Sequence, residues 1–162
     1  MTDVISHLSG ANNIVLASPL YFNNISGTLK VFMDRLTVTG SPHPPKAGKT
    51  ESKNDKPMDV VPPKLVMMSN CGFPDRSQFQ VVSLWIKRAA AMMQTNLIGE
   101  IYAVQGKLLS NPTDELRPAI DNYLKLLESA GKEIALNLKL AETTENLLQY
   151  DFHRMDKFDN QQ

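Results

Sequence analysis

The chain has 162 residues, of which 42% are hydrophobic and 21% are charged, and this length and composition indicate one globular domain. Its 17 basic and 17 acidic side chains cancel, which argues against a nucleic-acid or anionic-membrane partner, because both usually require a basic excess. The single cysteine, Cys71, excludes an intramolecular disulfide framework. No apolar run reaches the roughly 20 residues of a membrane-spanning helix, and the first ten residues lack a signal-peptide pattern. We therefore expect a soluble, cytoplasmic protein.

The chain opens with a predicted helix and a predicted strand. Thr2 to Leu8 carry apolar side chains at helical spacing, and Gly10 is placed to end a helix there. An apolar run from Ile14 to Ala17 then predicts a short buried strand. Because Pro19 has no N–H to donate into a sheet, the strand is expected to end near Ser18.

A polar and aromatic loop follows this strand. Leu20 to Ile25 is too short for a helix, and Ser26 is placed to cap one that continues from Gly27 to about Val38. In open α/β sheets, ligands bind outside the carboxyl ends of the strands. A loop with two aromatic residues and two asparagines at such an end is therefore a candidate binding loop. An ordinary strand-to-helix turn explains it equally well on physical grounds alone.

Residues 40–63 form a polar segment with six prolines. Such a composition cannot bury enough apolar surface to become ordered by itself, so we expect a mobile excursion. It is interpreted as a linker or insertion; the alternatives are a lid over the ligand site and a dimer arm.

Two further strands are predicted, one on each side of a regular helix. Lys64 to Ser69 is a short buried strand that ends at the turn Asn70-Cys71-Gly72. Ser77 to Gln94 carries a helical stripe of apolar residues. Asn96 to Val104 is the last predicted strand, and Gly99 is placed for a bulge in it. A strand, a helix and a strand in this order are typical of a parallel α/β sheet.

The C-terminal part is predicted to be helical. A long helix is indicated from Asn111, where an Asn-Pro pair can supply the cap and the first position, and Pro118 should bend or delay its start. Gly131 lies inside the helical pattern and is a candidate kink. Thr143 to Tyr150 is expected to add a short helix, and residues 151–162 form a polar tail, docked or frayed.

The stretch SPLYFNNISGTLKVFMDR, residues 18–35, closely resembles the flavin-contacting segment of flavodoxin-like NAD(P)H-dependent FMN reductases and quinone reductases. Their pattern is Ser-Pro-x-Tyr, a small polar loop, and Leu-Lys-x-Phe-x-Asp-Arg. The resemblance implies a flavodoxin-like three-layer α/β sandwich with a parallel sheet, formed by residues 1–162 as a single domain. It also implies bound FMN, NAD(P)H as cosubstrate, a small-molecule electron acceptor and a homo-oligomer.

Ten residues are implied as FMN contacts by this resemblance. The segment after the first strand is expected to wrap the isoalloxazine edge, and the turn after the second strand to approach its pyrimidine side. The ten residues are Ser18, Pro19, Leu20, Tyr21, Phe22, Asn23, Asn24, Asn70, Cys71 and Gly72.

One part of the family pattern has no counterpart here. Complete family members begin with a strand and a Ser-rich phosphate loop, and neither precedes the helix at Thr2. In the flavodoxin-like strand order 2-1-3-4-5, the strand at Asn13 to Ser18 would be the third. We therefore expect an N-terminally truncated sheet of about three strands, without a phosphate cradle and with an apolar edge.

No catalytic residue or metal ligand is indicated. His7, His43 and His153 lie in a helix end, the proline-rich segment and the tail, and they form no spacing that suggests a metal site or a Ser-His-Asp triad. Cys71 is interpreted as a packed side chain, with a catalytic thiol as the alternative. A flavin enzyme needs no dedicated acid or base, because the cofactor carries the chemistry. Two hypotheses follow: an FMN-dependent NAD(P)H oxidoreductase with a quinone, free flavin or similar acceptor, and a non-catalytic flavodoxin-like interaction module.

Overall fold

The computed structural model describes residues 2–36 and 62–149. Their three strands form one parallel sheet in the order β1 (Asn13–Pro19), β2 (Lys64–Asn70) and β3 (Leu97–Ala103). All three predicted strands are therefore confirmed to within a residue or two. The predicted excursion at 40–63, apart from its last two residues, and the predicted tail at 151–162 lie outside the described residues.

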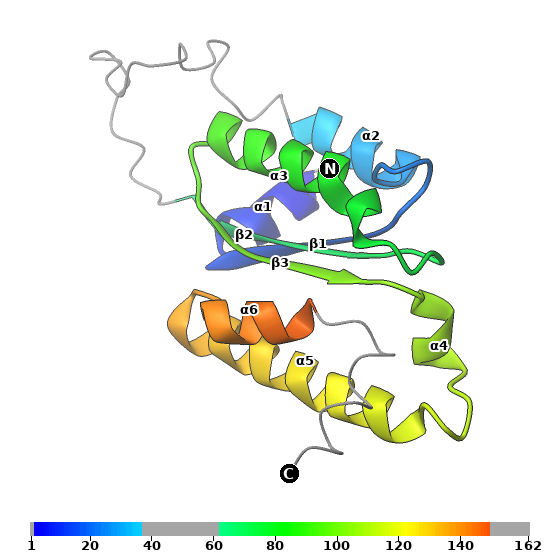
Figure 1. The fold of residues 1–162 in the computed structure, drawn as a ribbon. Coiled ribbons are helices and arrows are strands. Elements are labelled where there is room, and N and C mark those ends of the chain that lie inside the picture. Colours follow the sequence, from blue (N-terminus) through cyan, green and yellow to red (C-terminus); the bar gives the residue numbers. More distant parts are fainter. Residues whose placement is uncertain (1, 37–61, 150–162) are drawn as a thin grey trace.

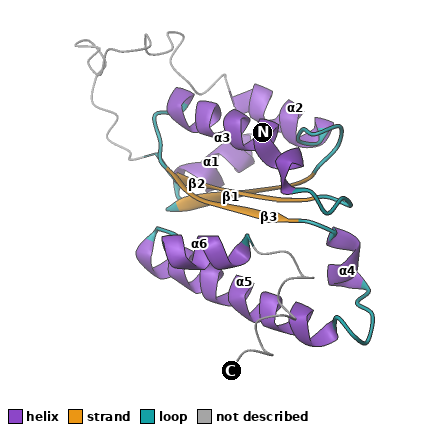
Figure 2. Cartoon of the chain, viewed as in Figure 1, coloured by secondary structure: helices purple, strands orange, loops and turns teal. Residues whose placement is uncertain are grey.

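Helices cover both faces of the sheet (Figures 1 and 2). One face carries α1 (Thr2–Ser9), α2 (Gly27–Leu36) and α3 (Gln80–Met92), which follows the 3₁₀ helix η2 (Arg76–Phe79). The other face carries α5 (Arg117–Asn137) and α6 (Glu142–Leu148), and the short helix α4 (Gly106–Ser110) connects β3 to α5. The predicted three-layer, flavodoxin-like α/β arrangement is confirmed. No helix within the described ranges is long and apolar enough to cross a membrane.

The central strand β2 separates two apolar clusters. Leu65 and Met67 pack on one face with residues of α3 such as Ile86, whereas Val66 packs on the other face with residues of α5 such as Ile120. Both sets are almost completely buried. A strand buried on both faces has a continuous apolar run instead of an alternating one, and this is the pattern that predicted it.

The predicted start of the long helix at Asn111 is wrong. Residues 106–110 form α4, whose end Asn111 caps by donating its N–H to the Lys107 carbonyl at 3.1 Å. The long helix α5 begins only at Arg117. Pro118 lies in its first turn, where a missing N–H is tolerated, and this explains the delay. Gly131 does not interrupt α5, whereas the short helix predicted at 143–150 is confirmed as α6.

Gly99 lies at a bulge, as its position in the sequence predicted. Leu65 pairs with Leu97 and Val66 pairs with Gly99, so Ile98 is the extra residue on β3. The freed Ile98 carbonyl accepts the Leu140 N–H at 3.0 Å. A Cβ atom added at Gly99 would lie only 3.2 Å from the Leu140 Cβ atom. Leu140, in the segment before α6, can therefore pack closely on the bulge because Gly99 has no side chain.

Substitutions at two glycines are expected to have opposite effects. Gly99→Val should lower the free energy of unfolding by about 1–3 kcal/mol, because its side chain presses on buried Leu140. Gly131→Ala should raise it by about 0.5–1 kcal/mol, because nothing lies within 4 Å of an added Cβ and alanine favours a helix. Urea unfolding followed by circular dichroism measures both values. Equal losses in the two variants would contradict this account of the bulge.

Candidate functional site

The loop after β1 is a tight turn that displays aromatic side chains. Tyr21 and Asn24 exchange backbone hydrogen bonds at 2.9 and 3.0 Å, and the φ angles of Phe22 and Asn23 between them are 48° and 60°. Two consecutive positive φ angles are typical of a type I′ turn. Left-handed backbone is unusual for a bulky residue, and here the two hydrogen bonds hold it in place. The Phe22 ring is fully exposed and the Tyr21 ring is largely exposed.

Buried Ser18 ties this loop to the helix that follows it. Its hydroxyl accepts the Ser26 N–H at 2.8 Å and donates to the Pro19 carbonyl at 2.9 Å. The Ser26 hydroxyl in turn accepts the Leu29 N–H at 3.3 Å, so the predicted N-cap of α2 is confirmed. The start of the loop is also bonded to β2, because the Leu20 N–H donates to the Asn70 carbonyl at 2.9 Å. The loop is thus fixed at its base and open at its tip.

The loop after β2 is held by β3 and α4. The Cys71 N–H donates to the Ala103 carbonyl at 3.0 Å, and the Gly106 N–H donates to the Cys71 carbonyl at 2.8 Å. The Cys71 thiol is buried and donates to the Phe73 carbonyl at 3.3 Å, which agrees with a packed side chain. A Cβ atom at Gly106 would lie 3.1–3.2 Å from the Asn70 side chain. Gly106 therefore sets where the Asn70 amide lies.

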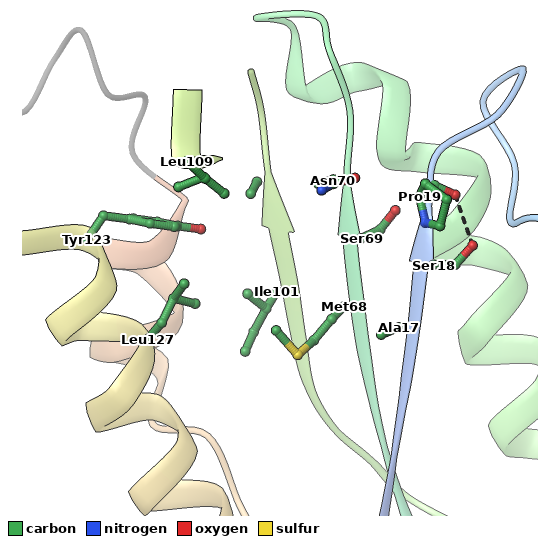
Figure 3. A pocket seen from close by; sticks show the side chains of 11 residues that line it. Ala17, Ser18, Pro19, Met68, Ser69, Asn70, Ile101, Leu109, Tyr123 and Leu127 are labelled. Carbon is green, nitrogen blue, oxygen red and sulfur yellow. Dashed lines mark hydrogen bonds between the residues drawn. The ribbon is translucent and has the colours of Figure 1, made fainter. Parts of the chain in front are cut away.

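A cavity of about 370 Å³ opens at the carboxyl ends of the strands, between the sheet and α5 (Figure 3). It is mostly apolar, and none of its lining residues is charged. Three strands and two helices contribute to it. The lining residues are Ala17, Ser18, Pro19, Met68, Ser69, Asn70, Ile101, Ala103, Leu109, Tyr123 and Leu127.

The structure divides the ten predicted contact residues into two groups. Three of them, Ser18, Pro19 and Asn70, line the cavity. The side chain of Leu20 packs against the core on the α3 side of the sheet, and Cys71 belongs to that core. The remaining five, Tyr21, Phe22, Asn23, Asn24 and Gly72, are exposed at the same end of the sheet. Ligand binding by all ten stays a prediction.

Two buried hydroxyl groups at the carboxyl ends of the strands were not foreseen. The Ser69 hydroxyl lies on the α3 face of β2, opposite the cavity, and has no hydrogen-bond partner among the described residues (Figure 3). The Tyr123 hydroxyl points from α5 toward the strands (Figure 3). Burial raises the pKa of this phenol, although the charge of Arg76 opposes the shift, so it stays a neutral donor. Ser69 directly precedes the predicted turn and was within reach of sequence reasoning, whereas Tyr123 looked like any other core residue of a helix.

A second, more polar cavity of about 740 Å³ lies beside β3, between α3 and α6. Glu100 accepts the Tyr102 hydroxyl at 2.7 Å and pairs with the Lys87 ammonium at 3.0 Å. Burial raises the pKa of the Tyr102 hydroxyl, and the bond to Glu100 adds to the shift. Burial also raises the pKa of the Glu145 carboxyl, and the negative charge of Glu100 raises it further. In residues 2–36 and 62–149, no group of three or more His, Cys, Asp or Glu side chains is arranged to hold a metal ion.

Comparison with known proteins gave one match. The family model described as NADPH-dependent FMN reductase matches residues 1–104, which extend from α1 through β3 and include both loops. This confirms the resemblance seen in the sequence. No curated protein and no solved structure matched the chain.

Proposed function

Because the chain belongs to the NADPH-dependent FMN reductase family, we propose that it is an FMN-dependent oxidoreductase that takes electrons from NAD(P)H and passes them to a quinone, a free flavin or a similar small acceptor. The observation that carries this proposal is the largely apolar, uncharged cavity at the carboxyl ends of the strands, with the Tyr123 hydroxyl directed from α5 toward the strands (Figure 3). Ligand sites of open α/β sheets lie at this end.

The residues present fit one half of FMN better than the other. A flat, largely apolar ring with polar edge atoms suits a cavity with apolar walls, the Asn70 amide and the Tyr123 hydroxyl. The exposed rings of Tyr21 and Phe22 lie at the same end of the sheet, beside Pro19. The phosphate group is a dianion, and no lining residue carries a positive charge. The cavity lining therefore supports binding of the ring and offers no positive charge to the phosphate.

When bound, FMN supplies the hydride chemistry, and the protein positions the ring. In this proposal the two loops at the ends of β1 and β2 would hold the ring edge. The α5 and β3 residues that line the cavity would exclude water from it. The Tyr123 hydroxyl, whose pKa is raised by burial, would offer a hydrogen bond to the ring.

A second candidate function follows from the uncharged lining. A chain that cannot pair the phosphate would hold FMN weakly, and it would then serve as a flavodoxin-like interaction module without catalysis. The purified full chain tests both candidates through the visible flavin absorbance band, measured with and without added FMN. Saturable binding with NAD(P)H oxidation in the presence of a quinone supports the enzyme. No binding at high FMN concentration would overturn it.

Tyr123→Phe is expected to weaken FMN binding by about five- to tenfold, the effect of one lost hydrogen bond. Ser69→Ala is the matched control, because it removes a buried hydroxyl from the opposite face of the sheet. That hydroxyl has no partner among the described residues, so the free energy of unfolding should change by less than about 0.5 kcal/mol or rise, and FMN affinity should not change. Unchanged FMN affinity in Tyr123→Phe would remove this hydroxyl from the site.

A further inference from the structure

The two edges of the sheet differ in their hydrogen bonding, and outward carbonyl groups of the β3 edge have partners. The outward Ile98 carbonyl accepts the Leu140 N–H, and the outward Tyr102 carbonyl accepts the Arg76 guanidinium at 2.7 Å. Charged Glu100 and Lys87 lie along the same edge. Hydrogen bonds to the edge and charges beside it are the means by which proteins prevent another strand from pairing there.

Within residues 2–36 and 62–149, no such feature is found at the β1 edge. The Lys64 N–H donates to the Asn12 carbonyl, and the Leu20 N–H donates to the Asn70 carbonyl. The N–H and C=O groups of the even-numbered residues of β1 therefore face β2. Because the direction of these groups alternates along a strand, the N–H and C=O groups of Asn13, Val15 and Ala17 point outward. Among the residues that the structure describes, no hydrogen bond reaches these three outward groups.

This open edge is also uncharged and apolar. No residue from Leu8 to Leu29 is charged, so the strand carries none of the lysines that commonly protect sheet edges. Val15 is 48% exposed. It borders a cavity of about 260 Å³, which shares Met68, Ile101 and Leu127 with the larger cavity on the same face. The exposed edge and the adjoining apolar face thus form one continuous surface.

We propose that β1 pairs in antiparallel fashion with β1 of a second copy of this chain, which joins the two sheets across a two-fold axis. An uncharged strand meets no like charge when it pairs with itself, and the contact is the same from both sides. The outward groups all lie at odd positions, so Val15 can face Ala17 of the partner subunit, and this register covers the half-exposed valine.

Two valine substitutions test the pairing by light scattering on the full chain over a range of protein concentrations. Val15→Lys puts two like charges close together at the paired edge and should raise the dimer dissociation constant by about tenfold or more. Val31→Lys, at a similarly exposed valine of α2 (52%), is the matched control and should leave the dimer intact. A wild-type chain that stays monomeric at every concentration would overturn the proposal, as would a Val15→Lys dimer as tight as wild type.

Amide hydrogen exchange on the wild-type chain gives a second readout that does not depend on the folding of a variant. In the dimer the outward N–H groups of Val15 and Ala17 are hydrogen-bonded and should exchange slowly. Dilution to the monomer should speed their exchange and leave that of the inward Leu16 N–H unchanged. Fast exchange at Val15 and Ala17 in a dimeric sample would place the dimer contact elsewhere and reject the β1 edge.

Discussion

Tyr123→Ala is expected to lower the free energy of unfolding by about 3–5 kcal/mol, the usual cost of truncating a buried aromatic residue. Tyr123 is 1% exposed and belongs to the cluster that joins α5 to the sheet, together with Val66, Ile101 and Ile120. Its removal would extend the cavity at the carboxyl ends of the strands into the core. Chemical denaturation of the full chain, followed by circular dichroism, measures the loss.

Two control variants distinguish the effect of losing the Tyr123 ring from the effects of losing its hydroxyl or of truncating any side chain of α5. Tyr123→Phe keeps the ring and removes the hydroxyl, so most of the stability should remain. Leu136→Ala lies on the same helix at an exposed position and should change the free energy of unfolding by less than about 0.5 kcal/mol. If Tyr123→Ala does not fold, Tyr123→Leu keeps part of the side-chain volume and should fall between wild type and the full loss. A Tyr123→Leu protein as stable as wild type would contradict the role of this ring.

The order and type of the main elements could be predicted because they depend on local patterns. β2 was recognised from the apolar run at Lys64 to Ser69, and α3 from an apolar stripe. The start of α5 was missed because two prolines gave competing signals. Pro112 follows an asparagine and looks like a helix start, but Pro118 occupies the first turn of the actual helix. Position along the sequence does not show which of two suitable starts leads to better packing.

The candidate site could be predicted only in part. Pro19 and the aromatic loop after it marked a strand end, and this located the carboxyl edge of the sheet. The sequence did not show on which face the cavity opens, because that depends on how far α5 covers the strands. For this reason Leu20, a predicted contact residue, packs against the opposite face. Tyr123 lines the cavity, although it lies on a helix about a hundred residues after Pro19 in the sequence.

Ser18→Ala is expected to lower the free energy of unfolding by about 1–3 kcal/mol, because it leaves the Ser26 N–H without its acceptor. The same bond fixes the loop that carries Tyr21 and Phe22, so FMN affinity should fall with stability. Urea unfolding and FMN titration of the full chain measure the two losses.

The comparison with Ser69→Ala makes this prediction specific. Ser18 and Ser69 are partners in the register of β1 and β2, and both are buried, but only the Ser18 hydroxyl is hydrogen-bonded. Two serines in equivalent places should therefore respond differently: Ser18→Ala loses stability and affinity together, whereas Ser69→Ala loses neither. If both variants lost the same stability, the Ser69 hydroxyl would have a partner in the folded chain, and the bond from Ser18 to Ser26 would not explain the loss in Ser18→Ala.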